Sequence, residues 1–323
     1  MKNLRELPKF KDSLSYLYIE HGRIEQRHKA VAWYGEEGEV AIPCASLGVL
    51  LLGPGTSITH AAVRALADNG CSICWVGEEG VRFYAGGMGE TWSSRNLLKQ
   101  VQAWSDPERH MGVVKEMYRM RFPQPLPQNL TLQQIRGMEG VRVRDTYARA
   151  SRTTGVPWSG RSYERGAWRS ASPVNRALSA GSACLYGICH AGIVSAGYSP
   201  ALGFIHTGKQ LSFVYDMADL YKAQLVVPAA FEVVADSDHA VERRVREKLR
   251  EASRRVHLLE RVVDDLAYLF ALSLDGDPYA EDGSLPGRLW DPMAEVPGGI
   301  AYGCDGAGKR SYESEGGAHE MDD

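Results

Sequence analysis

Four side chains of the kinds that bind divalent cations are spread over three segments of the sequence: Glu139, His206, Asp216 and Asp219. One imidazole with three carboxylates and no thiolate suits Mg²⁺ or Mn²⁺ better than structural zinc. A hard cation with open coordination positions can polarise a phosphoryl oxygen and activate a hydroxyl group. These residue types therefore favour metal-assisted attack on a phosphodiester.

Glu139 is predicted to lie on the buried face of a helix. Leu132 and Ile135 share one helical stripe, and Glu139 is the next position of that stripe. Because an unpaired buried carboxylate is costly, Glu139 must be paired, protonated or bound to a metal. Taken alone, the segment favours an ion pair with one of its own arginines, which are Arg136, Arg142, Arg144, Arg149 and Arg152.

Asp216 and Asp219 are three residues apart and should share one helical face, directly after a glycine-flanked loop that carries His206. Two neighbouring carboxylates repel each other unless a cation separates them, although a helix N-terminus stabilises them in part. Taken alone, the pair favours an ordinary acidic first turn. With a metal bound, Lys209, Lys222 and the arginine-rich helix would neutralise phosphates around the site.

The elements that must position these residues fall into two regions. Up to about residue 90, strand-forming residues dominate. Strands are expected at 14–19, 30–34, 40–43 and 49–52, a helix at 59–67, and a hairpin of 71–76 with 81–85. Helical periodicity follows, and residues 131–134 have the form of a capping box that opens a helix expected over 131–154. Further helices are expected over 173–196, 212 to just before Pro228, and about 239–272.

This order predicts an α+β protein: an N-terminal β-rich domain (1–92), an all-α C-terminal catalytic domain (93–275) and a flexible, acidic, Gly/Pro-rich tail (276–323). The tail carries eleven Asp or Glu against three Lys or Arg, a local charge of −8. Because the whole chain has a net charge of −3, the body carries +5, which is compatible with a polyanionic partner. No apolar run approaches the roughly 18 residues that span a bilayer, so we expect a cytoplasmic protein with no membrane partner.

Three other motifs do not indicate a metal-binding or catalytic site. Cys71 and Cys74 form a C-x-x-C pair, but they lie in a predicted strand, where positions three apart face opposite sides. The glycine-rich turn around Pro54 lacks the lysine of a phosphate-binding loop. Ser199 is followed by Pro200, which removes the backbone N–H that a hydrolase oxyanion hole would need. Neither ATP hydrolysis nor serine hydrolysis is therefore expected.

Several runs of residues, occurring in order, resemble the Cas1 family of CRISPR-associated integrases, most closely its subtype I-E branch. They are Arg-Gly-Met-Glu-Gly at 136–140, continuing to Tyr147, Ser-Ala-Cys-Leu-Tyr-Gly at 182–187, and Gly-Phe-Ile-His-Thr-Gly-Lys at 203–209, leading into Phe-Val-Tyr-Asp at 213–216. The resemblance covers roughly residues 5–272. It implies an endonuclease and integrase that joins the 3′-hydroxyl ends of a short spacer-precursor duplex to the CRISPR repeat by transesterification, without a nucleotide energy source.

The resemblance also implies roles for individual residues. Glu139, His206 and Asp219 match the family's ligands for Mg²⁺ or Mn²⁺, and Asp216 matches the neighbouring acidic residue. Arg64 and Arg82 match positions implicated in DNA contact, and Tyr186 and Lys222 match positions near the active centre. Together with Arg136 and Lys209, whose charges suit phosphates, these are the expected DNA-binding residues. His21 stands where the branch has a tyrosine that braces the duplex end. The expected partners are double-stranded DNA, a second copy of the chain in a homodimer, and a Cas2 subunit.

Two other functions fit the same residues. One is a non-catalytic nucleic-acid-binding scaffold in which the acidic cluster is structural. The other is a plain metal-dependent nuclease acting on branched DNA or RNA. Product analysis distinguishes them, because hydrolysis only shortens strands whereas transesterification creates longer, joined ones.

Overall fold

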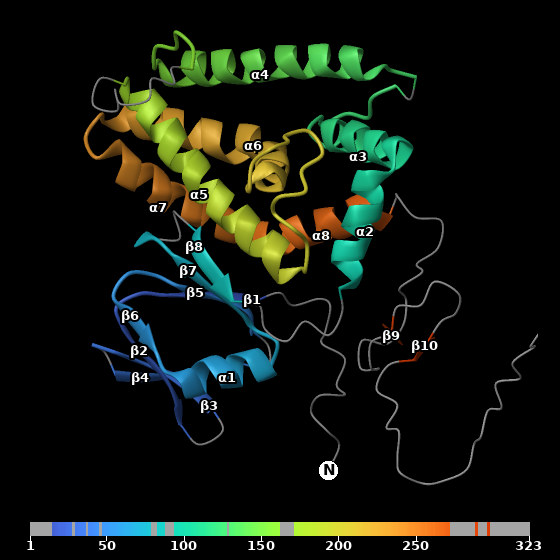
Figure 1. Ribbon diagram of the computed structural model, residues 1–323. Helices are drawn as coiled ribbons and strands as arrows, with labels where there is room; N and C mark the ends of the chain where they lie inside the picture. Colours follow the sequence, from blue (N-terminus) through green and yellow to red (C-terminus); the bar gives the residue numbers. More distant parts are fainter. Residues whose placement is uncertain are drawn as a thin grey trace, which may run out of the picture. The chain divides into compact units, whose positions relative to one another are not determined.

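The computed structural model describes residues 15–27, 30–36, 38–44, 47–78, 83–87, 94–127, 129–161 and 171–271, and the pairs 288–289 and 296–297. The chain divides into two compact units, residues 1–280 and 281–323. In the first unit, strands with one helix precede a run of helices (Figure 1). The α+β fold, β-rich first and helical second, is therefore confirmed, whereas the predicted boundaries near 92 and 275 stay predictions.

One sheet is covered on both faces. It contains β1 (Ser15–Ile19), β5 (Leu47–Leu52), β7 (Ser72–Val76) and β8 (Phe83–Gly87) in the order β1-β5-β7-β8. The first three strands are parallel, and β8 pairs antiparallel with β7 as the predicted hairpin. A parallel strand buried on both faces needs an unbroken apolar run, which β5 supplies.

Successive side chains of these strands point to opposite faces of the sheet, and each face packs into a different hydrophobic core. Leu50 packs into a core with Leu66 of the helix α1 (His60–Asp68). Its neighbour Leu51 packs into another core with residues of α5 (Pro173–Ser195) and α8 (Leu258–Ala271). Cys71 belongs to the first core and Cys74 to the second, and both are free thiols. The expectation that these two cysteines face opposite sides of the strand is therefore confirmed.

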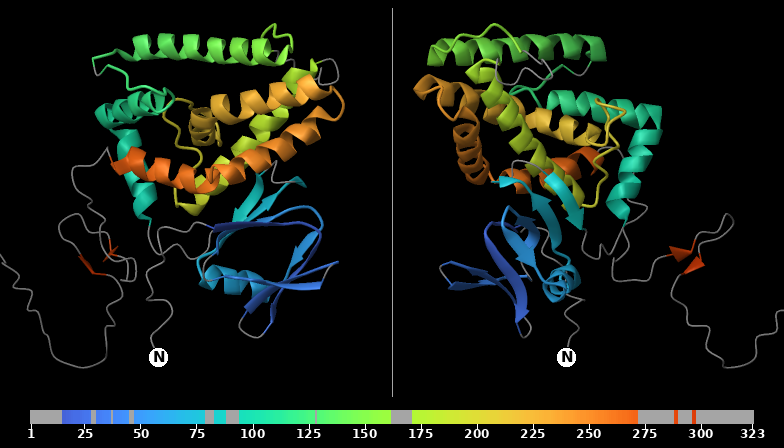
Figure 2. Two further views of the ribbon diagram at one scale, coloured as in Figure 1. Left: turned by 180° about the vertical axis from the view of Figure 1, so that it is seen from behind. Right: turned by 60° about the vertical axis from the view of Figure 1, so that its left-hand side comes forward.

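A second sheet, of order β4-β3-β2-β6, packs on the other side of α1 (Figure 2). Its strands are β2 (Gly22–Arg27), β3 (Ala30–Gly35), β4 (Gly38–Ile42) and β6 (Thr56–Ile58). β3 and β4 were expected, but β2 and β6 were not. β2 is mostly polar and half exposed, so its sequence lacks an apolar pattern, and β6 has only three residues.

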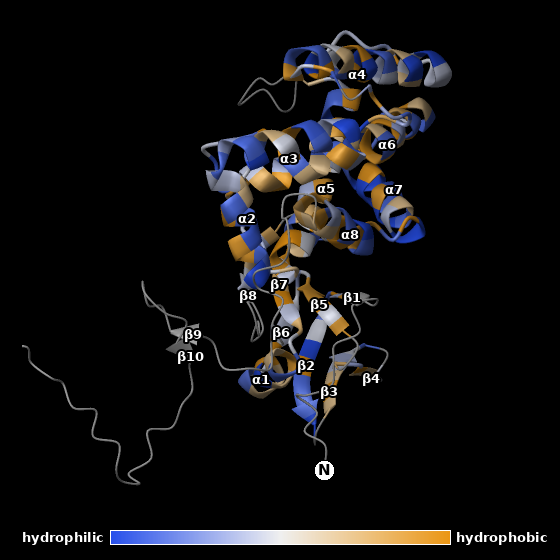
Figure 3. Cartoon of the chain, turned by 90° about the vertical axis from the view of Figure 1, so that its right-hand side faces the viewer, coloured by the Kyte–Doolittle hydropathy of each residue, from blue (hydrophilic) through white to orange (hydrophobic). Residues whose placement is uncertain are grey.

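The helical region is built around one apolar helix. Its elements are α2 (Arg95–Ser105), α3 (Pro107–Arg119), α4 (Leu132–Thr154), α5 (Pro173–Ser195), α6 (Ser212–Asp236), α7 (Val241–Arg255) and α8 (Leu258–Ala271). In α5, a Cβ at Gly181 would lie 2.9 Å from Leu249, and one at Gly192 would lie 2.7 Å from Val262. Small residues therefore let α7 and α8 approach α5 closely. Apolar residues gather on β5, β7 and α5 (Figure 3).

Among the described helices, α5 alone is long and apolar enough to cross a membrane by length and composition. However, 72% of its apolar window is buried inside the protein. It packs against α6, α7 and α8 and against the sheet. We therefore assign it as the core helix of this region.

Two helix boundaries differ from the prediction. α6 continues through Pro228, although proline removes one backbone hydrogen bond, because the flanking Val227 and Ala229 are buried on either side. The single helix expected over 239–272 is two helices, α7 and α8, separated at His257, whose φ of 48° is left-handed. In the second unit, the described residues are the antiparallel pair β9 (Arg288–Leu289) and β10 (Val296–Pro297).

Candidate active site

Asp216 organises the loop that precedes α6. Its carboxylate is fully buried and accepts hydrogen bonds from the backbone N–H groups of Phe204 at 2.6 Å, Ile205 at 3.0 Å and His206 at 2.9 Å. Three N–H donors supply the neutralisation that a buried carboxylate requires. The repulsion expected between Asp216 and Asp219 is thus offset at Asp216 by the N–H groups of the loop backbone.

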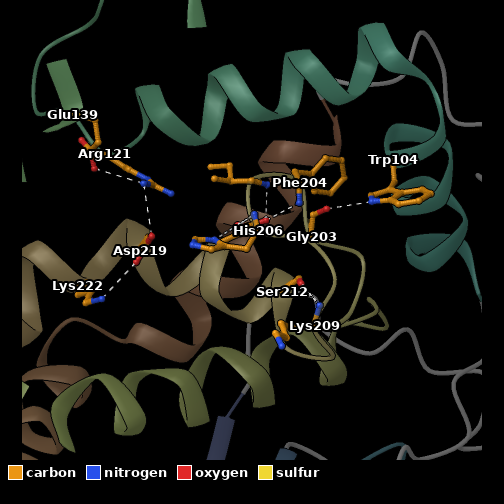
Figure 4. Close-up of polar contacts among 12 residues, drawn as sticks. Trp104, Arg121, Glu139, Gly203, Phe204, His206, Lys209, Ser212, Asp219 and Lys222 are labelled. Atoms are coloured by element: carbon orange, nitrogen blue, oxygen red, sulfur yellow. Dashed lines mark hydrogen bonds and ion pairs between the residues drawn. The ribbon is translucent and has the colours of Figure 1, made fainter. Parts of the chain in front are cut away.

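The same carboxylate orients the imidazole of His206. Nδ1 of His206 lies 2.7 Å from Oδ1 of Asp216, and this hydrogen bond is the main reason that the pKa of His206 is raised. With the hydrogen on Nδ1, the lone pair of Nε2 is available to a ligand, which is the arrangement of metal-binding histidines backed by a carboxylate. The side chain is 44% exposed and extends from the loop away from Trp104 (Figure 4).

Glu139 lies on the buried face of α4, as its stripe with Ile135 predicts. α4 begins with the expected capping box at Thr131 and Gln134. Arg142 binds the carboxylate of Glu139 with two hydrogen bonds, of 2.7 and 2.9 Å. The ion pair between Glu139 and an arginine of the same helix, which the segment taken alone favours, is therefore present.

A second arginine connects Glu139 to Asp219. Nη1 of Arg121 lies 3.5 Å from Glu139 and 3.8 Å from Asp219, so one guanidinium bridges carboxylates from α4 and α6 (Figure 4). Asp219 also pairs with Lys222, one helical turn further along α6, at 3.9 Å. The sequence analysis missed Arg121, because it precedes Phe122 and Pro123 outside any recognised motif.

A metal ion at this site would be held by Glu139, His206 and Asp219. Their donor types fit Mg²⁺ or Mn²⁺, and the half-exposed imidazole with its free Nε2 fits a ligand role. Within the described ranges, however, no three His, Cys, Asp or Glu side chains stand close enough to hold an ion. Arg121 lies between Glu139 and Asp219 and contacts both carboxylates.

Side chains of α2 hold the loop that carries His206. The buried amide of Gln100 donates to the carbonyls of Ser199 and Leu202 and accepts from the N–H of Ser199. Trp104 donates from Nε1 to the carbonyl of Gly203 at 3.1 Å (Figure 4). One helical turn separates Gln100 from Trp104, so both face the loop. These positioning residues were also missed, because nothing local marks a glutamine that binds a distant loop.

The residues expected to contact DNA lie on different elements. Arg136 is exposed on α4, Lys209 is exposed in the loop after His206, and Lys222 is partly buried beside Asp219. Tyr186 of α5 makes an edge contact with Tyr215 of α6, with ring centroids 5.0 Å apart. Thus Lys222 is brought next to the candidate site.

Two further predicted contacts belong to the β-rich region. Arg64 is exposed on α1 and lies 3.8 Å from Asp68. His21 lies in the turn between β1 and β2 with a φ of 51°. Arg82 lies outside the described residues.

The chain resembles known proteins over most of its length. The family model "CRISPR associated protein Cas1" matches residues 119–244. The CRISPR-associated endonuclease Cas1 2 of Thermus thermophilus is 60% identical over 318 residues, which cover 98% of this chain and 98% of that protein. The CRISPR-associated endonuclease Cas1 of Escherichia coli K12 is 40% identical over 254 residues, which cover 78% of this chain and 83% of that protein.

Solved structures share the fold. The crystal structure of a TtCas1–DNA complex has a TM-score of 0.75 and 62% sequence identity, and the match covers 82% of this chain and 99% of that one. A casposase bound to an integration product has a TM-score of 0.52 with 15% identity, covering 83% of this chain and 99% of that one, a likeness of fold alone.

The two-part fold and these similarities define a CRISPR-associated protein. The chain belongs to the Cas1 family of CRISPR-associated endonucleases. The relatives named above do not separate the branches of that family, so subtype I-E stays a prediction.

Proposed function

We propose that this chain is a metal-dependent DNA integrase of CRISPR adaptation, of subtype I-E. It would join the 3′-hydroxyl ends of a short spacer-precursor duplex to the CRISPR repeat by transesterification. The observation that carries the proposal is the convergence of Glu139 and Asp219 on one buried arginine, next to a histidine whose free Nε2 is oriented by Asp216. The family membership supports the same chemistry.

Each residue of the site has a separate task. Glu139, His206 and Asp219 would hold Mg²⁺ or Mn²⁺, which would supply polarisation of a phosphoryl oxygen on the phosphate whose phosphorus atom is attacked. Asp216 fixes the loop backbone and the ring of His206, and it does not touch the DNA. Lys222, partly buried beside Asp219, is placed to neutralise a phosphate, and exposed Lys209 to bind the backbone further out.

The DNA surface extends beyond the site. Arg136 on α4, Tyr186 on α5, and Arg64 and Arg82 of the β-rich region are assigned to contacts with the duplex. The partners are double-stranded DNA, a second copy of the chain and a Cas2 subunit, and the setting is the cytoplasm, away from membranes. A DNA complex of a TtCas1 protein that is 62% identical supports the DNA contacts.

A scaffold without catalytic activity is the second candidate, because Arg121 pairs Glu139 with Asp219 as a purely structural cluster would. The test incubates purified protein, with and without Cas2, with a labelled duplex and a supercoiled plasmid that carries a CRISPR repeat. Reactions contain Mg²⁺, Mn²⁺ or EDTA. Label joined to the plasmid only with metal supports the integrase. Shortened strands alone indicate a plain nuclease, and no strand chemistry under any condition indicates the scaffold.

A further inference from the structure

Arg121 occupies the place between two carboxylates where a cation is needed. Its side chain is only 6% exposed, and Nη1 contacts both Glu139 and Asp219 (Figure 4). These contacts, at 3.5 and 3.8 Å, are longer than the two hydrogen bonds that Arg142 makes to Glu139. Arg121 therefore balances charge between α4 and α6 without the tight geometry of a permanent ion pair.

The remaining donors of Arg121 are poorly satisfied. Nε and Nη2 are buried, yet neither has a hydrogen-bond acceptor among the residues that the structure describes. The Cζ atom lies 4.8 Å from the centre of the Tyr118 ring, which offers a cation–π contact instead. Because buried donors without acceptors are costly, the position of Arg121 depends on the attraction of the two carboxylates.

We propose that Arg121 is a resident counter-cation that competes with the divalent ion for Glu139 and Asp219. In the metal-free protein it bridges the two carboxylates, each of which also has a partner of its own in Arg142 or Lys222. When the ion binds between the carboxylates, the guanidinium must leave, because its positive charge at that place would oppose the ion. The inference rests on the proposed function, since it concerns the same metal site.

If Arg121 and the divalent ion compete, removing the charge of Arg121 should lower the stability of the metal-free protein and raise its affinity for Mn²⁺. In Arg121→Met, the metal-free protein loses its counter-cation and melts at a lower temperature than wild type. The same variant binds Mn²⁺ more tightly, by about tenfold, because no guanidinium has to be displaced. Mn²⁺ therefore raises the melting temperature more in the variant than in wild type. A merely structural arginine would lower both the metal-free melting temperature and the Mn²⁺ affinity.

The experiment measures Mn²⁺ binding by calorimetry, and melting temperatures in EDTA and in Mn²⁺, for wild type and Arg121→Met. Arg119→Met is the matched control, because Arg119 pairs with Glu116 on α3 and should change neither quantity appreciably. Tighter Mn²⁺ binding together with a less stable metal-free protein supports the proposal. Equal or weaker binding by a folded variant overturns it and leaves the metal site intact.

Two further outcomes are decisive. If neither wild type nor the variant binds Mn²⁺, the metal site is wrong, and the proposed function fails together with this inference. If Arg121→Met does not fold, crystals of the wild-type protein grown with EDTA and with Mn²⁺ decide. With Mn²⁺ bound, the guanidinium should lie beyond 4 Å from both carboxylates, and retained contacts would overturn the proposal.

Discussion

Asp216 and His206 are joined twice, because Oδ1 of Asp216 accepts hydrogen bonds from both the backbone N–H and the ring Nδ1 of His206. One oxygen atom therefore fixes the position of the residue and the direction of its imidazole. Since Asp216 is fully buried, this control comes from the core of the helical region rather than from solvent-exposed groups.

Replacing Asp216 should damage the fold as well as the chemistry. In Asp216→Asn, an amide NH₂ group replaces one oxygen that accepts backbone hydrogen bonds. We expect a loss of about 2–3 kcal/mol of unfolding free energy, because hydrogen bonds to a buried charged group are lost. Asp219→Asn is the comparison. The carboxylate of Asp219 is partly exposed and, among the described residues, pairs with the side chains of Arg121 and Lys222, so this variant should abolish joining with a smaller loss of stability. Urea denaturation and the joining assay measure both quantities, and equal stability losses would contradict this division of roles.

Gln100 should influence the site from a distance. Gln100→Ala removes three hydrogen bonds to the loop backbone and leaves buried polar groups unpaired. We expect a loss of about 2–3 kcal/mol of unfolding free energy and a lower joining rate, because the His206 loop is released. Gln133→Ala, on the exposed face of α4, is the control and should be neutral. A Gln100→Ala protein as stable and active as the control would show that α2 does not position the loop.

His190 should make the protein sensitive to acid. Burial lowers the pKa of His190 to about 4, and its ring lies against Phe83 of β8, tilted by 31° with centroids 3.7 Å apart. The unfolded chain binds the proton near pH 6.5, so the stability that His190 contributes is present above pH 6.5 and is lost as the pH falls towards 4.

His190→Leu removes this titration. Between pH 7 and pH 4, the unfolding free energy of wild type should fall by about 3 kcal/mol more than that of the variant. Denaturation at several pH values measures the difference. Parallel pH curves for the two proteins would mean that His190 is not held neutral by its surroundings.

Deleting residues 276–323 should leave joining largely intact. The segment carries a net charge of −8, which repels DNA, so its removal should also strengthen binding to a duplex at low salt. Binding measured at two salt concentrations, with the joining assay, tests both effects. Complete loss of joining in a folded, truncated protein would give the segment a role in catalysis.

Local patterns were sufficient for the framework of the site. The capping box at Thr131 and the apolar stripe placed Glu139 on the buried face of α4, where the structure has it. The apolar run at 49–52 predicted a strand, and the structure buries this strand, β5, on both faces. Pro228, in contrast, misled the prediction, because burial of its neighbours outweighs the missing hydrogen bond and α6 continues.

The partners of the site residues could not be predicted in the same way. Arg121 meets Glu139 and Asp219 only after α3, α4 and α6 have packed, so no spacing in the sequence connects the three. Gln100 likewise reaches a loop that is distant along the chain. The sequence of each segment predicted candidate metal ligands. Which charged side chains neutralise these ligands is decided by how the helices pack.

The most direct measurement compares His206→Ala with wild type in the joining assay, with Mn²⁺ or Mg²⁺ and Cas2 present. His206 is partly exposed, and its loop is held mainly through backbone groups, so the variant should fold and bind duplex DNA. His239→Ala, at an exposed position, is the control. We predict joined product from wild type and His239→Ala and none from His206→Ala. Joining at the wild-type rate by His206→Ala would contradict the account.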